Sequence, residues 1–575
     1  MSDTEEDEQT GNHEAEGDQG CPVPTWAERR CGRPIYNAPP GIDEEPVCLM
    51  HSRDPDKDNA KFQAEFERIL KEAGTGTADL SYFVFPSANY GMREFTAQCS
   101  FAWARFAGDA LFYQAKFGQR ADFTGAVFTR DSSFWQATFT QDAEFGGSKF
   151  AKGAEFTETT FIGNARFSGA SFGGPATFWK ARFMREALFG GADFTEDAEF
   201  RDASISEDAI FNEATFGGQA GFRRTAFMGV AAFIRATFTA DADFTWATFA
   251  QRAEFRFAAF EGQAIFRETR FREDNTLSPG PIFSNARFDK PTAVTFFRTF
   301  LGQAIFRNCD MSMFVFSDVR WRERSNNGKR MLFEEVADPG DEALGAIPAQ
   351  GRGPDERNYR LISELYQQLK KNYDDRRDYW TAGDFHYGEM EMKRLACPRL
   401  TWLSQLEAKL SGRPRLRKLG EWCGKLRCSP WLLSELRSWH QRLGLAAWYR
   451  RASDYGESWG KPLLWLSAVI VLFAALYPLL GLRPAEGRSP AAKTTPIQVQ
   501  TASLQETSLR YWNCERPGRL FRDSVMTSLS VAAFQRDLAY EPGYPWGRLL
   551  ALVELLLTST LIALILLAVR RQFRR

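Results

Sequence analysis

Residues 181–189 read Ala181-Arg182-Phe183-Met184-Arg185-Glu186-Ala187-Leu188-Phe189, and this pattern decides the fold. From about Phe95 to Phe271, large apolar residues recur at alternating steps of five and six. A small residue, most often Ala, commonly lies two places before each of them. In this series Ile205 replaces Phe. The repeating unit is therefore eleven residues long, and such regular self-similarity is the signature of a solenoid.

The spacing favours strands over helices. On a helix, at about 100° per residue, steps of five and six scatter the apolar residues around the whole cylinder. In an extended chain the Ala and the Phe two places later project to the same side, and the polar residues between them face water. Gly, Asp, Asn and Thr in the intervening steps suit corners. We therefore predict a β-helix in which two units form one coil and the Phe rings stack along the axis.

The repeat resembles bacterial pentapeptide-repeat proteins, in the Phe-centred variant where pentapeptide and hexapeptide steps alternate. The resemblance implies a right-handed quadrilateral β-helix. The expected fold class is thus mainly β solenoid, followed by a helical linker region and two transmembrane α-helices. The resemblance also implies a protein partner bound through the β-helix. Some relatives mimic DNA and bind topoisomerase, but Lys and Arg nearly balance Asp and Glu along residues 95–271, so this role is a minor alternative.

The amino-acid composition indicates the cellular compartment in which the protein resides. The 575 residues carry a net charge of −1, which predicts no global attraction to nucleic acid. Nine cysteines are scattered without paired spacing. Residues 1–20 are acidic and polar, which predicts a disordered tail and not a secretory leader. We expect a reducing environment, with thiols free or bound to metal.

Residues 21–57 form a candidate zinc-binding segment. Cys21, Cys31, Cys48 and His51 are spaced C-x9-C-x16-C-x2-H. The last two residues suit two ligands on one turn, and the residues around Cys31 resemble a knuckle. Three thiols and an imidazole fit structural zinc. The alternative is three free cysteines and a surface histidine in a Pro-rich linker.

Four regions follow. Residues 58–90 hold an amphipathic helix that we expect to cap the first coil, because solenoid ends need covering. The β-helix is expected over residues 91–320, and a flexible loop over 321–354.

Residues 355–395 have the periodicity of an amphipathic helix and resemble a segment of membrane-anchored pentapeptide-repeat proteins. Within it, we favour a packed histidine at His386 over a metal or acid–base site.

The C-terminal part has membrane character. Residues 396–461 are basic and rich in Trp, as interfacial helices are, with a soluble helical bundle as the alternative. Residues 462–482 and 547–569 are long and apolar enough to cross a membrane. Basic residues flank both outer ends, which predicts a multi-pass protein of the cell (inner, cytoplasmic) membrane. Both termini, including the tail at 570–575, would be cytoplasmic.

The loop between the spans, residues 483–546, carries a pore-helix-like segment at 521–534. This order of elements resembles the pore module of the two-transmembrane potassium-channel superfamily, in which a Ser- and Thr-rich segment lies between two membrane spans. The potassium filter uses glycines to aim carbonyls at the ion, and this stretch has none, so the filter is degenerate. The pore-like residues are Thr527, Ser530, Val531, Ala532, Ala533 and Phe534. Glu554 in the second span is a further candidate, because an ionisable residue in hydrocarbon is costly unless it faces protein or water. Snorkelling to the interface is its alternative.

These patterns do not predict an enzyme. Gly169-Ala170-Ser171-Phe172-Gly173 matches a nucleophile elbow only as a string, since Ser171 is an ordinary position of one repeat. We expect a homo-oligomeric, membrane-anchored scaffold or sensor that presents a rigid cytoplasmic β-helix. The alternative is an ion channel, not typically potassium-selective, that the solenoid gates.

Overall fold

The computed structural model describes the chain in segments. These are residues 20–25, 29–273, 279–289, 294–311, 314–337, 358–396, 439, 441–480, 482–484, 517–534, 540–542 and 545–573. The chain forms two compact units, Met1–Arg357 and Asn358–Arg575.

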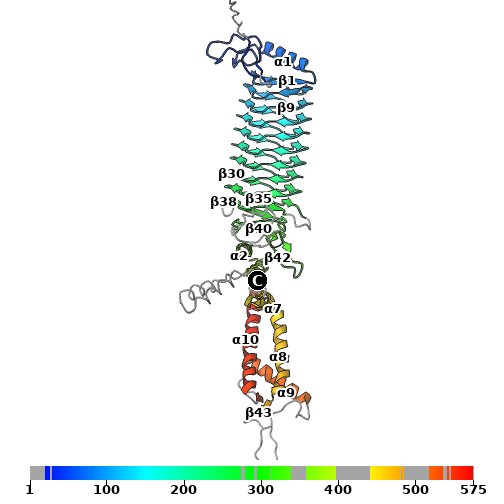
Figure 1. The fold of residues 1–575 in the computed structure, drawn as a ribbon, viewed down its shortest axis with the longest axis vertical. Coiled ribbons are helices and arrows are strands. Elements are labelled where there is room, and N and C mark those ends of the chain that lie inside the picture. Colours follow the sequence, from blue (N-terminus) through cyan, green and yellow to red (C-terminus); the bar gives the residue numbers. More distant parts are fainter. Residues whose placement is uncertain are drawn as a thin grey trace, which may run out of the picture. The chain divides into compact units, whose positions relative to one another are not determined.

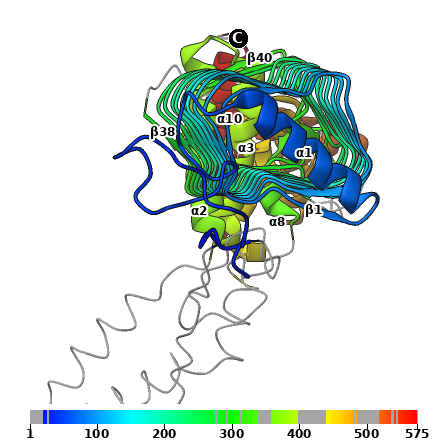
Figure 2. The same ribbon diagram turned by 90° about the horizontal axis from the view of Figure 1, so that it is seen from above.

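The first unit is a β-solenoid of about ten turns (Figure 1). Its short parallel strands run from β1 (Thr77–Asp79) to β40 (Val315–Ser317) and fall on four sheets in rotation. The sheets, named here by their first strands β1, β2 (Val84–Phe85), β3 (Ala88–Asn89) and β4 (Glu94–Phe95), contain 10, 10, 11 and 9 strands. Viewed along the axis, the coils superimpose (Figure 2). The predicted four-sided β solenoid is confirmed.

One coil shows how the repeat builds the sheets. It consists of β19 (Ala176–Thr177), β20 (Arg182–Phe183), β21 (Ala187–Leu188) and β22 (Asp193–Phe194). Each strand pairs in register with the equivalent strand of the next coil, so that Ala187 lies beside Ala209. The pairing places each sequence position directly above its equivalent, and identical side chains therefore form columns.

The core is filled by phenylalanine rings. Phe189 is fully buried, and its ring stacks on those of Phe167 and Phe211, with centroids 4.8 and 4.9 Å away. It meets Phe178 edge to face at 5.3 Å. Both arrangements are favourable for aromatic pairs. Ala fills the narrower interior positions. Where Thr225 takes such a position, its hydroxyl donates to a backbone carbonyl at 2.8 Å, so the buried polar atom is satisfied.

The corners differ in one respect from the sequence expectation. Two tight corners per coil contain a residue with positive φ, which is glycine at Gly169 but Trp, Lys and Arg at Trp103, Lys180 and Arg224. A left-handed conformation costs a non-glycine residue on the order of 1 kcal/mol. The inter-coil hydrogen bonds offset that cost, since Trp103 N–H donates to the carbonyl of Thr124 at 2.7 Å. The ladder therefore imposes this conformation on any side chain.

The two ends of the solenoid are closed differently. At the N-terminal end α1 (Asn59–Ala73) lies across the first coil (Figure 2), where Phe62 packs on Phe85 with ring centroids 5.3 Å apart. At the other end β36 (Arg270–Phe271) is the last strand of the β4 sheet, whereas the β3 sheet continues through β39 (Val294–Phe297) and β40. The hairpin β41 (Arg322–Glu323) and β42 (Arg330–Met331) and the short helix η1 (Phe333–Glu335) follow.

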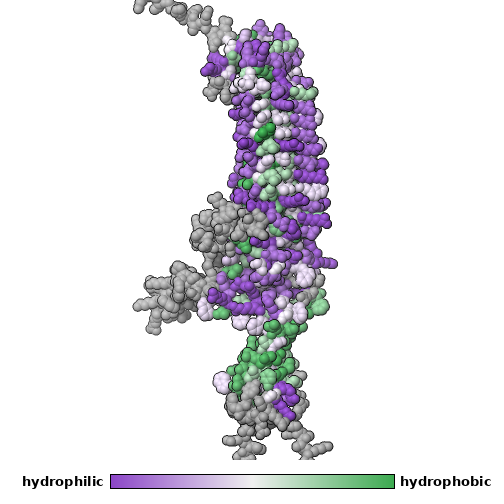
Figure 3. Space-filling view, turned by 90° about the vertical axis from the view of Figure 1, so that its right-hand side faces the viewer, coloured by the Kyte–Doolittle hydropathy of each residue, from purple (hydrophilic) through white to green (hydrophobic). Residues whose placement is uncertain are grey.

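The second unit is helical. Its helices are α2 (Tyr359–Asp375), α3 (Tyr379–Leu395), α7 (Leu445–Ser453), α8 (Gly460–Leu480), α9 (Pro517–Ala532) and α10 (Pro545–Phe573), and β43 (Leu482–Pro484) pairs with β44 (Tyr540–Pro542). Two helices are long and apolar enough to span a membrane: α8, with 21 residues, and 26 residues of α10. Their exposed surfaces are hydrophobic (Figure 3). Most of the basic, Trp-rich stretch at 396–461 lies outside the described residues.

We expect Phe189→Ala to destabilise the solenoid by about 3–5 kcal/mol, because it removes stacking and leaves a cavity in a closed column. Met184→Ala is the matched control, since Met184 is half exposed and should change stability by no more than about 0.5 kcal/mol. Urea unfolding of residues 20–337 measures both. Equal effects of the two substitutions would contradict the stacked core.

Glu334 should make the stability of the solenoid, at its C-terminal end, depend on pH. It is buried and accepts the Phe306 N–H at 2.7 Å, and burial raises its pKa to about 7. Between its ordinary pKa of 4.5 and about 7, the folded state holds a proton that the unfolded state releases. Stability should therefore fall with rising pH across this window, by about 3 kcal/mol in total. Glu334→Gln should abolish that slope in urea titrations at pH values on either side of the window. An unchanged slope in the variant would assign the effect to other groups.

Candidate functional site

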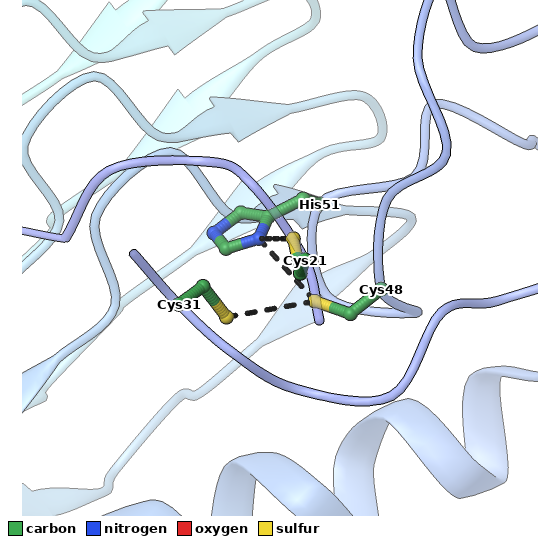
Figure 4. Close-up of side chains that lie close together, drawn as sticks. All are labelled: Cys21, Cys31, Cys48 and His51. Carbon is green, nitrogen blue, oxygen red and sulfur yellow. Dashed lines mark hydrogen bonds between the residues drawn. The ribbon is translucent and has the colours of Figure 1, made fainter. Parts of the chain in front are cut away.

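Four side chains of the N-terminal segment form one cluster (Figure 4). The ligand atoms of Cys21, Cys31, Cys48 and His51 all lie within 4.8 Å of one another. Cys21 Sγ and Cys48 Sγ are each 3.3 Å from His51 Nδ1, and Cys31 Sγ lies 3.9 Å from Cys48 Sγ. A tetrahedral site with metal–sulfur bonds of about 2.3 Å has ligand–ligand edges of about 3.8 Å. The cluster therefore has the dimensions of a metal site.

Local turns bring the ligands together. Cys48 and His51 share one turn, in which His51 N–H donates to the Cys48 carbonyl at 3.0 Å. Gly32 N–H donates to the Cys21 carbonyl at 3.1 Å, which places Cys31 close to Cys21. Gly32 has φ of +64°, a left-handed conformation that glycine adopts without steric cost. The wide spacing between the cysteines is thus closed by turns of the backbone.

The electrostatics of the cluster suit a cation. The hydrogen bond with Cys48 lowers the pKa of Cys31 well below its usual range, which favours the thiolate that a metal ion binds. Arg33 Nη1 donates to this sulfur at 3.1 Å. His51 Nε2 lies 3.2 Å from the carbonyl of Ser81 and donates to it, which leaves the Nδ1 lone pair facing the thiols. A carbonyl of this kind commonly orients a metal-bound histidine. The four residues could hold a metal ion.

The cluster belongs to the end of the solenoid. The His51 ring meets Phe83 of the first coil edge to face at 5.2 Å. Nearby, the buried Lys57 Nζ donates to the carbonyls of Leu49 and Val84 at 3.0 and 2.6 Å, and burial lowers its pKa to about 8. The segment around the cysteines is thereby hydrogen-bonded to the edge of the β2 sheet.

A second cluster surrounds Glu554, which is fully buried in α10. Tyr477 of α8 donates its hydroxyl to Oε2 at 2.5 Å, and the hydroxyl of Ser528 in α9 contacts Oε1. The Ser528 hydroxyl is also 3.1 Å from the carbonyl of Ile470. The carboxyl group thus connects three helices inside the unit and does not reach outward. Its partners are 77 and 26 residues away in the chain, and no sequence pattern indicated them.

The pore-like segment is helical. At one end of α9, Leu520 packs on Phe473 and Tyr477, and towards the other end Ser528 reaches Ile470 in the middle of α8. The pore-like residues within α9 are Thr527, Ser530, Val531 and Ala532, and Ala533 and Phe534 form the turn that ends it. Helical carbonyls point along the helix axis. They do not form the ladder that a potassium filter presents to an ion.

A third cluster joins α3 to α7. The buried Glu391 pairs with Arg394 at 2.5 Å and with Arg450 at 3.0 Å, and it accepts the hydroxyl of Tyr455 at 2.9 Å. These partners lie on α3, on α7 and in the turn after α7. The carboxylate therefore fixes how the helices of the second unit pack.

His386 lies beside this region. Its Nδ1 is 3.6 Å from Glu389 Oε2, and Lys393 and Lys370 contact the same carboxylate at 2.5 and 3.2 Å. These groups hold the pKa of Glu389 well below its usual range. The ring of His386 also lines a pocket of about 410 Å³ together with Lys370, Tyr379 and Arg571, so it is partly open and not packed on all sides.

Comparison with known proteins identifies the repeats. A family model for pentapeptide repeats (9 copies) matches residues 134–182, 178–226 and 222–270, all within the solenoid. No curated protein and no solved structure matches the chain. The fold thus defines a β-solenoid with a phenylalanine core, and its central coils are pentapeptide repeats. Proteins built on such repeats typically serve structural or interaction roles.

Proposed function

We propose that this protein is a membrane-anchored scaffold that presents its β-solenoid to a protein partner at the cytoplasmic face of the cell membrane. The observation that carries the proposal is an interior filled by stacked phenylalanine rings, such as the column that runs from Phe85 on Phe106 to Phe260 on Phe288. A solenoid whose interior is filled by side chains acts through its outer surface. Its backbone is rigid because every coil is hydrogen-bonded to the next.

The membrane anchor rests on α8 and α10. Both carry exposed apolar side chains along their length, such as Leu464 and Val471 on α8 and Leu556 and Leu566 on α10. Lipid would cover this surface, or a second copy of the chain would. Basic residues at the outer ends of both helices favour cytoplasmic termini, and homo-oligomers through the same helices are part of the proposal.

Conduction is the second candidate. It is favoured by one observation, the entry of α9 between α8 and α10 as far as Glu554. The helical state of Ser530, Val531 and Ala532 argues against a carbonyl filter. The anchoring role therefore comes first.

One experiment separates the two roles. We expect the full chain to remain in membranes after alkaline carbonate extraction, and a chain ending at Arg357 to be released. Proteoliposomes containing the full chain should pass potassium and sodium no faster than empty liposomes. Release of the full chain would sink the anchor. Ion flux that Glu554→Gln alters would favour the channel.

We also propose that the Cys21, Cys31, Cys48 and His51 cluster binds structural zinc. Zinc accepts such a ligand set in a tetrahedral arrangement and contributes folding free energy when bound. Bound there, it would lock the N-terminal segment over the first coil and protect the open ends of the sheets from pairing with other chains.

The metal content of the purified chain tests this role. We expect about one zinc per chain in the wild type and little in Cys48→Ser, because three ligands hold the ion much less tightly. Hydrogen exchange in β1 and β2 should rise in that variant. Cys99→Ser is the control, since Cys99 is equally buried but lies outside the cluster. Wild-type protein without metal, or equal zinc in both variants, would refute zinc binding by these residues.

A further inference from the structure

One corner of the solenoid gathers arginine and aromatic side chains. It lies between the β3 and β4 sheets and is called the Arg–Trp corner here. It consists of two neighbouring positions that repeat on successive coils: Arg223, Arg267 and Phe297 occupy one, and Arg224, Trp246 and Arg298 occupy the other. Trp246 is 40% exposed although it belongs to a rigid coil. Trp and Arg are the residues most enriched among energetic hot spots of protein interfaces.

The aromatic rings of this corner are held in place by stacked guanidinium groups. Arg224 and Arg223 lie over the Trp246 ring at 5.0 and 5.8 Å. The Trp246 Nε1–H donates to Glu268 at 3.3 Å. Arg267 stacks on Phe297 at 5.4 Å. Because these groups are already ordered, little side-chain entropy is lost when a partner binds.

Two arginines of the corner, and the neighbouring Arg270, have no anionic partner in the part of the chain that the structure describes. Among the described residues, no carboxylate lies within ion-pair distance of Arg224, Arg267 or the exposed Arg270. Other arginines nearby are paired, such as Arg298 with Asp318 at 3.3 Å and Arg320 with Glu273 at 2.8 Å. The guanidinium groups of Arg224, Arg267 and Arg270 therefore offer N–H donors in the fork geometry that binds carboxylates.

The corner ends in a pocket. Because the β4 sheet stops at β36 while the β3 sheet continues, a space of about 550 Å³ remains beyond the last strand. Its aromatic wall is made by Trp246, Phe271 and Phe300, and its cations are Arg270, Arg298 and Arg320. A large apolar side chain fits such a wall while a neighbouring carboxylate meets Arg270, since Arg298 and Arg320 already pair with Asp318 and Glu273.

We propose that the Arg–Trp corner and its terminal pocket form the docking site for an acidic protein segment that carries at least one large apolar side chain. This inference rests on the proposed scaffold role and names the class of partner. The pocket also contains Glu268 and Glu273. These carboxylates would repel the continuous phosphate chain of a nucleic acid. A peptide, in contrast, carries its carboxylates at separate points and has backbone N–H groups that can donate to Glu268 and Glu273.

Fluorescence anisotropy of a labelled peptide tests the site on the full-length chain in detergent. The probe is a twelve-residue peptide in which Glu or Asp alternates with Ser, with a central Trp, so that its carboxylates stand at separate points. Its control has Gln and Asn at the acidic positions, and a twelve-nucleotide oligothymidylate tests nucleic acid. We expect saturable binding of the acidic peptide alone, weakened tenfold or more by Arg270→Gln and by Trp246→Ala.

Phe257→Ala is the matched control variant. Phe257 is 51% exposed on the next half-coil, but it lies at the opposite corner, between the β1 and β2 sheets. We expect it to change the affinity less than twofold. The inference is overturned if the amide peptide binds equally well, if the oligonucleotide binds more tightly, or if Phe257→Ala weakens binding as much as Trp246→Ala. Absence of binding overturns it as well.

The scaffold proposal can fail separately. Arg270→Gln changes one exposed side chain of the solenoid, so a folded variant that stays in membranes but loses the peptide supports both proposals. A wild-type chain that stays in membranes and binds no acidic peptide sinks only the docking site. Release of the chain from membranes by carbonate extraction contradicts the membrane anchor, whether or not the acidic peptide binds.

Discussion

Ring stacking and strand pairing in this solenoid require the same distance. Hydrogen-bonded strands lie about 4.7–4.9 Å apart, and stacked rings such as Phe128 and Phe150, or Phe145 and Phe167, have centroids 4.6 and 4.7 Å apart. One coil repeat therefore satisfies the backbone and the core together. A shift of register by one residue would turn every ring outward. This agreement of two distances makes the rod continuous and rigid, and it explains why the period of the sequence is so strict.

The first and last coils of such a repeat must be covered by other segments, because each coil leaves backbone groups that only a further coil would pair. The N-terminal end is closed by α1 and by the segment that carries the Cys21, Cys31, Cys48 and His51 cluster. At the other end the sheets stop at different coils, and the space beyond β36 becomes a pocket lined by arginines and aromatic rings. The functional candidates of the solenoid thus lie where the repeat stops, since its interior positions are occupied mostly by Phe and Ala.

The second unit, in contrast, buries carboxyl groups, which need polar partners inside the protein. Glu391 is surrounded by two arginines and a tyrosine hydroxyl, and Glu554 by the hydroxyls of Tyr477 and Ser528. A buried carboxyl without such partners costs several kcal/mol. Each of these glutamates therefore fixes the helices that supply its partners, and neither requires a catalytic role to explain its burial.

The sequence by itself determined the solenoid, its register and its inward-facing Phe and Ala, because a strict period in an extended chain has one solution that buries the apolar residues. It also indicated the four metal-ligand candidates by residue type and the two apolar spans by length. Only the tertiary structure decided that Trp103 and Arg224 adopt left-handed corners and that Arg224 stacks on Trp246 one coil later. It likewise decided the hydroxyl partners of Glu554 and the helical state of Ser530. These features depend on residues brought together from distant parts of the chain, or on hydrogen bonds that override local preference, and a local pattern carries no information about either.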